Sequence, residues 1–189
     1  MSPIAIKILD RALKEWNVAI NALEEGKMFV LLRKGGIKED TKSFQVPHRW
    51  VWLYPTYEHQ KPELLKTKYS SLVTPVASGW HPKTVRISSC AEITQVFSVR
   101  EKERLTALSS YHIWNEGFSS DRLKWKPNQP ISVLLLRTYL LPQAVVIPYN
   151  DVYKGCKSWI DLVEPISVEG ITPVVDDDSF DRKTKEISL

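Results

Sequence analysis

Two apolar runs lie close together between Lys27 and Gln60, and each is followed by polar residues. The first run, Met28 to Leu32, leads into Arg33 to Gly36 (RKGG), and the second, Val46 to Pro55, leads into the sequence TYEHQ. Apolar runs of this length, bounded by turn residues, are typical of β-strands. The stretch therefore predicts two strands that deliver polar groups at their ends, and the rest of the chain has to pack around them.

The N-terminal residues have the spacing of a helix. Ser2-Pro3 suits a helix start, because serine caps the first turn and proline fits the first helical position. Apolar residues then recur three or four positions apart as far as Gly26, a residue type common just past helix ends. These residues are Ile6, Leu9, Leu13, Trp16, Ile20 and Leu23. The pattern predicts one long helix with a single apolar face.

Most of the remaining chain is predicted to form strands. Only two short helices are expected, at Glu63 to Lys68 and at Lys102 to Tyr111. The further strands are Thr84 to Val99 with a bulge near Gln95, Ile131 to Tyr139, Val145 to Ile147 and Ser158 to Leu162. Strands that follow one another without helical crossovers pair mostly antiparallel. The sequence therefore predicts an α+β fold, with the long N-terminal helix packed on a mostly antiparallel, curled sheet or small open barrel.

Length and charge suggest one domain followed by a tail. The chain has 189 residues, 43% of them apolar, which is enough for a single domain with a sizeable core. We expect this domain to span residues 1–170 and residues 171–189 to form an acidic, disordered tail. The last 14 residues contribute −2 to the net charge of +4, which leaves +6 on the other 175. A net positive charge on these 175 residues suits an anionic partner such as nucleic acid, and it also favours solubility.

Cysteine use and hydropathy predict a cytoplasmic protein. Cys90 and Cys156 match no zinc-ligand spacing, so we expect both to be reduced and predict no metal and no cofactor. Charged residues interrupt the N-terminal apolar positions, so no signal-peptide pattern is present. The apolar runs are too short to cross a bilayer, and no membrane association is expected. The sequence leaves the oligomeric state open.

Two basic segments are candidates for nucleic-acid binding. Arg33 and Lys34 precede two glycines, whose backbone N–H groups could help to hold a phosphate, although the segment equally suits a plain hairpin turn. Further along, cations alternate with aromatic rings at Trp114, Arg122, Lys124 and Trp125. Bases stack on such rings while cations contact phosphates, but tryptophans also anchor loops to a core. The first function hypothesis is a module that binds single-stranded or locally unpaired nucleic acid.

A histidine-based enzyme is the alternative hypothesis. His48, His59 and His112 lie at predicted ends of strands or helices, and Glu58 precedes His59. If the sheet curls, these four residues would converge into the acid–base site of a hydrolase or phosphodiesterase. No two of them have a recognised ligand spacing, so separate local hydrogen bonds are the simpler interpretation. A third hypothesis is a regulatory domain that binds a peptide or a protein.

The order of several motifs resembles one protein family. ALKEWNVAINAL, VLLRKGGI and LYPTYEHQ are followed by RLKWKP, LLLRTYLLP and GCKSW. In this order they resemble the domain of unknown function 1802 family, from about Ala12 to Leu162. The resemblance implies a bacterial, mainly cyanobacterial, protein and no particular activity. A weaker similarity, to PUA-like barrels that bind RNA or modified bases, is an analogy based on strand order and basic aromatic loops.

Overall fold

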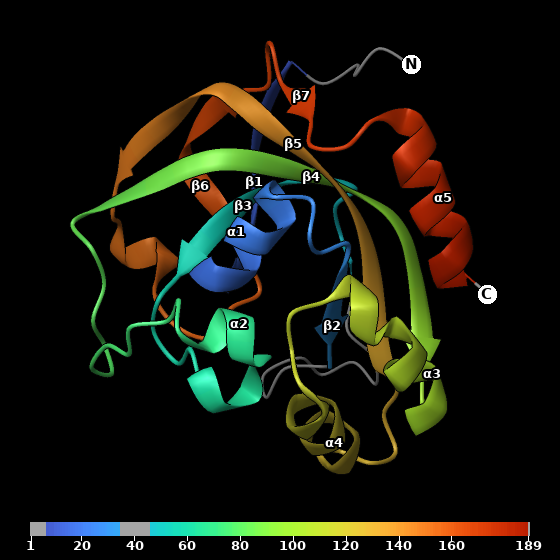
Figure 1. The fold of residues 1–189 in the computed structure, drawn as a ribbon. Coiled ribbons are helices and arrows are strands. Elements are labelled where there is room, and N and C mark those ends of the chain that lie inside the picture. The colour runs from blue at the N-terminus through green and yellow to red at the C-terminus, as the bar shows by residue number, and fades with distance from the viewer. Residues whose placement is uncertain (1–6, 35–45, 189) are drawn as a thin grey trace.

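A mixed β-sheet is the frame of the protein (Figure 1). The structure is a computed structural model that describes residues 7–34 and 46–188. The strands in these ranges are β1 (Ile8–Trp16), β2 (Val30–Arg33), β3 (Trp50–Thr56), β4 (Thr84–Val99), β5 (Ile131–Pro148), β6 (Trp159–Ser167) and β7 (Thr172–Pro173). Their order in the sheet is β2-β5-β4-β3-β1-β6, with β7 paired to β5 beside this path. Because β2 and β6 lie at opposite ends of this order, the sheet is open.

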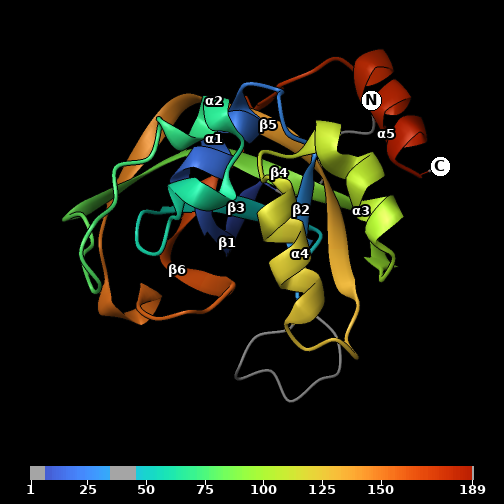
Figure 2. The ribbon, with the colours of Figure 1, turned by 60° about the horizontal axis from the view of Figure 1, so that its bottom comes forward.

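Short helices cover the sheet. Those in the described ranges are α1 (Asn17–Glu24), α2 (Thr67–Ser70), α3 (Lys102–Ala107), α4 (Glu116–Lys124), α5 (Asp177–Ser188) and the 3-10 turns η1 (Pro62–Leu64), η2 (Leu108–Tyr111) and η3 (Asp151–Tyr153). In Figure 1, β4 and β5 form a long arch above α1, with α2 and α4 below it and α5 outside it. Figure 2 shows α4 in front of β2.

The two long strands β4 and β5 bend the sheet. They pair antiparallel along their length, with register shifts between Ile87 and Ser89 and between Ile93 and Gln95. A bulge of this kind bends a strand and increases its twist. The bulge predicted near Gln95 is confirmed. The separate strands predicted at Ile131 to Tyr139 and Val145 to Ile147 are instead parts of the continuous β5.

Both faces of the sheet are buried. Val51 and Leu53 of β3 belong to the larger apolar core, together with α1, β2 and α4. Trp52 and Tyr54, which point to the opposite face, belong to a second core with β6 and the far half of β5. Successive side chains alternate between faces along a strand, so β3 contributes to both cores. The two-sided burial agrees with the two faces that alternation assigns to this segment.

The predicted fold class is wrong, because the long N-terminal helix is absent. Residues 8–16 form β1, and only Asn17–Glu24 are helical. The pairing of β1 with β6 shifts register between Leu9 and Arg11. This irregularity places Leu9 and Ala12, three residues apart, in the same core, while Leu13 enters the other core. A bulged strand with both faces covered has therefore imitated the spacing of a helix.

The sheet also differs from the predicted one in its pairing and closure. β1 and β3 are parallel neighbours, whereas the other strand pairings in the described ranges are antiparallel. The sheet is therefore mixed, and it does not close into a barrel. The parallel pair has a functional consequence, because the C-terminal ends of two parallel strands lie at the same edge of a sheet.

The C-terminal residues are ordered where we expected a disordered tail. α5 spans Asp177–Ser188, and Asp176 caps it by accepting a hydrogen bond from the Ser179 N–H at 2.7 Å. Phe180 and Ile187 are buried in the larger core. They are seven residues apart, which is two helical turns, so both lie on one face. The acidic composition of this segment concealed these two apolar anchors.

Candidate functional site

A cleft of about 470 Å³ lies at the C-terminal ends of the parallel strands β1 and β3. The register pairs Lys14 with Tyr54 and Trp16 with Thr56, so both strands end at this edge. Figure 2 shows the elements around it, with α4 and β2 on one side and β6 on the other. The walls comprise Lys14 to Trp16, Leu32, Arg33, Thr56, Glu58, His59, Ser78, Gly79, Trp114, Phe118, Arg122 and residues 154–158. We call this hollow the cleft.

The walls of the cleft carry more positive than negative charge. Five cationic side chains line it, against the two carboxylates Glu15 and Glu58. The cations are Lys14, Arg33, Arg122, Lys154 and Lys157. A concave surface lined by one sign of charge concentrates ligands of the opposite sign. The cleft is therefore suited to an anionic ligand.

Arg33 is fixed in the wall of the cleft. Its Nη2 donates to the Lys14 carbonyl oxygen at 2.6 Å and to Glu15 Oε2 at 2.8 Å. The Glu15 side chain is only 7% exposed, so this ion pair is largely shielded from water. Its other carboxylate oxygen accepts the Trp16 N–H at 2.7 Å. Arg33 thus neutralises a buried carboxylate and also presents its charge to the cleft.

Arg122 on α4 has a different role, because its guanidinium has no polar partner within residues 7–34 and 46–188. The guanidinium carbon lies 4.9 Å from the centre of the Phe118 ring and 5.9 Å from that of Trp125. Burial lowers the pKa of Arg122, and the charge of Arg33 lowers it further, while Glu15 acts in the opposite direction. Five N–H donors in a planar fork, held between rings and left unused, form a ready site for a phosphate or carboxylate.

The helix that carries Arg122 is held at both ends. Asn115 Oδ1 accepts the Phe118 N–H at 3.1 Å and so caps the start of α4. At the other end Lys34 Nζ donates to the carbonyl oxygens of Arg122 and Leu123, at 2.6 and 3.3 Å. Lys34 is 5% exposed, and burial lowers its pKa, as do the charges of Arg122 and Arg100. Lys34 therefore caps a helix, and its ammonium group does not line the cleft.

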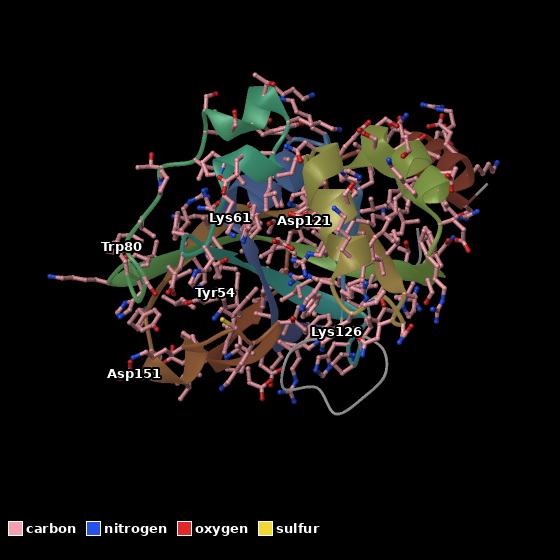
Figure 3. The ribbon with its side chains drawn as sticks, turned by 90° about the horizontal axis from the view of Figure 1, so that it is seen from below. Tyr54, Lys61, Trp80, Asp121, Lys126 and Asp151 are labelled. Atoms are coloured by element: carbon pink, nitrogen blue, oxygen red, sulfur yellow. The ribbon has the colours of Figure 1, made fainter. Side chains whose placement is uncertain are left out.

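The other predicted nucleic-acid residues fall into two groups. Trp114 lines the cleft but is buried, with its ring stacked on Phe118 at 4.8 Å between centres. Trp125 and Lys124 lie at the exposed end of α4, outside the cleft wall. Figure 3 labels Asp121, which lies within α4, and Lys126, which follows this end of the helix. The predicted glycines Gly35 and Gly36 lie outside the described residues.

The structure does not bring the predicted histidines together. His59 lines the cleft, with Nε2 3.2 Å from Glu58 Oε1. His112 is buried outside it, 5.7 Å from Trp114 between ring centres, and burial together with the charge of Lys66 lowers its pKa to about 4. His48 packs edge-on against Trp159 at 6.3 Å. Among the described residues, no group of three or more His, Cys, Asp or Glu could hold a metal ion. The histidine-based hydrolase site is therefore not assembled.

Among the four predicted catalytic residues, Glu58 lines the cleft and is held there by hydrogen bonds from neighbouring residues. Its Oε1 accepts the Gly79 N–H at 2.6 Å and the Ser78 hydroxyl at 3.2 Å. The Gly79 N–H is the main reason why the pKa of Glu58 is lowered, with smaller contributions from His59, Ser78 and Lys14. The carboxylate is therefore ionised at neutral pH, with Oε1 occupied and Oε2 available as an acceptor.

Sequence reasoning missed several residues that line the cleft. Lys14 and Glu15 fall within the predicted N-terminal helix, but the structure places both in β1. Lys154 and Lys157 were not among the predicted site residues, although two exposed lysines flanking Gly155 are a local signal for an anion-binding loop. Lys14 Nζ holds this loop by donating to the carbonyl oxygens of Tyr153 and Gly155, at 2.6 and 2.8 Å.

The fold and site define an α+β protein with an open mixed sheet and a cationic cleft at one edge. The chain belongs to the DUF1802 family (domain of unknown function), whose model matches residues 12–186. A crystal structure of a mutant ZmASCH protein from Zymomonas mobilis is similar at 14% identity and a TM-score of 0.38, covering 93% of this chain and 94% of that chain. No curated protein matches the chain. In the described ranges, no helix is long and apolar enough to cross a membrane.

Proposed function

We propose that this protein binds single-stranded or locally unpaired nucleic acid in the cleft. The observation that carries the proposal is the Arg122 guanidinium, which lies beside Arg33 in the cleft wall and has no polar partner in the described part of the chain. Because Glu15 is already paired with Arg33, the Arg122 guanidinium keeps its N–H donors free for a further anion. A phosphate supplies both the charge and the paired acceptor oxygens.

The surroundings of Arg122 favour nucleic acid over a small inorganic anion. The cleft continues from Arg122 past Arg33 to the exposed lysines Lys154 and Lys157, which is more than one anion needs. Trp125 is 37% exposed beside Arg122, so a ring is available for a base outside the cleft. Cations that follow a backbone, interleaved with rings that accept bases, are the usual means of holding a single strand.

The exposed lysines provide a test that leaves the fold intact. Fluorescence anisotropy with a labelled single-stranded oligonucleotide, DNA or RNA, would measure the affinity across a salt series. Each phosphate contact adds about 0.7 to the slope of log affinity against log salt for a single strand. We expect Lys154→Ala with Lys157→Ala to reduce this slope by about 1.4, because neither ammonium group has a partner in the described residues.

A matched control removes the same charge elsewhere. Lys102 on α3 and Lys185 on α5 are exposed and lie outside the cleft wall, so Lys102→Ala with Lys185→Ala should leave the slope unchanged. An equal loss in both double variants would mean that net charge, and not the cleft, drives binding. Absence of binding at low salt by the folded wild type, for DNA and RNA alike, would overturn the proposal.

A further inference from the structure

A second, smaller pocket of about 80 Å³ opens beside the cleft, and four tyrosines and a tryptophan are among the residues that line it. Its rings come from three separate parts of the chain: Tyr54 and Tyr57 at the end of β3, Trp80 in the loop between α2 and β4, and Tyr149 and Tyr153 after β5. Figure 3 shows Tyr54 between Trp80 and Asp151, on the side of the molecule away from Lys126. We call this hollow the aromatic pocket.

Two ring pairs of the pocket are not stacked, which leaves ring faces available, whereas Tyr149 is already stacked on His81 at 3.6 Å between ring centres. Trp80 meets Tyr57 at 5.8 Å and 85°, and Tyr54 meets Tyr153 at 5.5 Å and 59°. Trp80 is 45% exposed, an unusual state for a tryptophan that already has a ring neighbour. A flat ligand that stacks on Trp80 would cover this apolar surface.

Two polar groups of the aromatic pocket are available to a ligand. The Tyr54 hydroxyl is buried and has no hydrogen-bond partner in the described ranges. Burial strongly raises the pKa of Tyr54, so the hydroxyl stays protonated and can both donate and accept. Glu58 Oε2 also has no partner among the described residues, and an ionised carboxylate accepts hydrogen bonds only. The pocket therefore suits a flat group with an N–H edge.

The aromatic pocket and the cleft are continuous. Lys14, Glu58 and Gly79 line both of them, so a ligand that occupies one reaches the other directly. At this junction the carboxylate of Glu58 opposes the attraction of Lys14 and Lys154 for a phosphate, whereas Arg33 and Arg122 line only the cleft and attract one there. A nucleotide at the junction would consequently direct its base into the aromatic pocket and its phosphate towards the cleft.

From these observations we infer that the aromatic pocket receives one unstacked nucleobase, and that the base presents an amino or ring N–H group to Glu58. This inference rests on the proposed function, because the strand in the cleft supplies the base. It adds a recognition element to that function. An unpaired strand can deliver such a base at low cost, while a duplex has to break a base pair first.

Free nucleosides test the pocket without any phosphate. Saturation-transfer NMR detects weak binding of a nucleoside to the whole protein. We expect transfer from the wild type to cytidine and adenosine, with loss of the signal in Trp80→Ala and a weaker signal in Glu58→Gln, which keeps the size of the side chain but removes the charge. Leu72→Ala is the control, because it removes an exposed apolar side chain that lines neither the aromatic pocket nor the cleft, and it should leave the nucleoside signal unchanged.

The oligonucleotide separates this inference from the proposed function. We expect Trp80→Ala to weaken binding of single-stranded DNA by about tenfold at every salt concentration, with an unchanged salt slope, because only a stacking contact is lost. If Trp80→Ala binds DNA like the wild type and no nucleoside receives saturation, the base pocket is refuted while phosphate binding in the cleft stands. Binding of tetramethylammonium in place of the nucleosides would also overturn the inference, because it would identify a cation site.

Discussion

The layer beneath the short helices and the part of the cleft around Arg122 both contain packed cations, but these cations differ in their polar partners. In the helix layer, which we define by Lys34, Lys66 and His112, each ammonium group is bound to backbone carbonyls. Lys66 donates to Ser109 and His112, as Lys34 does to the end of α4. In the cleft, Arg122 is also packed against rings, yet its guanidinium has no polar partner in the described residues. The polar partners of a cation, and not its residue type or its neighbours in sequence, distinguish a folding role from a binding role.

The largest expected effect concerns the helix layer and is a loss of stability in acid. The pKa of His112 is lowered to about 4 in the folded protein, so between pH 6.5 and 4 the unfolded chain binds the extra proton. Stability should therefore fall as the pH drops through this window, by about 3 kcal/mol in total, and level off below it. Denaturant titrations at several pH values should show this loss in the wild type and not in His112→Phe. Parallel curves for the two proteins would contradict it.

The second prediction concerns Arg33, which stabilises the fold through its ion pair with Glu15 and also lines the cleft. Arg33→Ala leaves the shielded carboxylate of Glu15 without its partner and should cost about 2–3 kcal/mol, somewhat less than a fully buried pair because Arg33 is 18% exposed. Adding Glu15→Gln removes the uncompensated charge and should recover more than half of that loss. A double variant no more stable than Arg33→Ala would show that the ion pair is not what Arg33 contributes to the fold.

Lys34 should affect stability alone. Lys34→Met keeps the apolar stem but removes two hydrogen bonds from a charged donor to the end of α4, which should cost about 1.5 kcal/mol. Because the ammonium group does not line the cleft, the salt slope of oligonucleotide binding should remain that of the wild type. A slope reduced as much as in an Arg122 variant would place Lys34 among the phosphate contacts.

Arg122, unlike Lys34, should affect nucleic-acid binding more than stability, and its substitution should cost the least stability of those considered. Arg122→Ala removes contacts with the rings of Phe118 and Trp125, which are worth about 1 kcal/mol or less at such a site. The salt slope should nevertheless fall by about 0.7. A much larger loss of stability, measured by denaturant titration, would make Arg122 a folding residue and remove the contrast between the two regions.

The sequence predicted the parts of the site that depend on strand ends. The apolar runs before Arg33 and before Glu58 were assigned to strands, and the structure brings the two ends into one cleft. The bulge near Gln95 also follows from local alternation. These features depend on residues that are close together in the chain.

The features of the fold and of the cleft that the sequence did not predict depend on contacts between residues far apart in the chain. The register shift in β1 gave residues 8–16 a helical spacing, which hid both the parallel pairing with β3 and the position of Lys14 and Glu15. Similarly, Lys34 was paired with Arg33 because the two are adjacent, but successive residues of an extended chain point in opposite directions. α5 was missed because two apolar residues anchor an otherwise polar segment.

Cys156 offers the most direct test of nucleic-acid binding in the cleft. It is an exposed, free thiol in the cleft wall, whereas Cys90 is buried and burial raises its pKa to about 12. A thiol reagent should therefore modify the folded protein once, at Cys156, as intact-protein mass spectrometry can verify. A saturating single-stranded oligonucleotide should slow this modification severalfold, and the protection should disappear as salt releases the strand. An oligonucleotide that binds by anisotropy yet leaves the rate at Cys156 unchanged would show that the cleft is not the binding site.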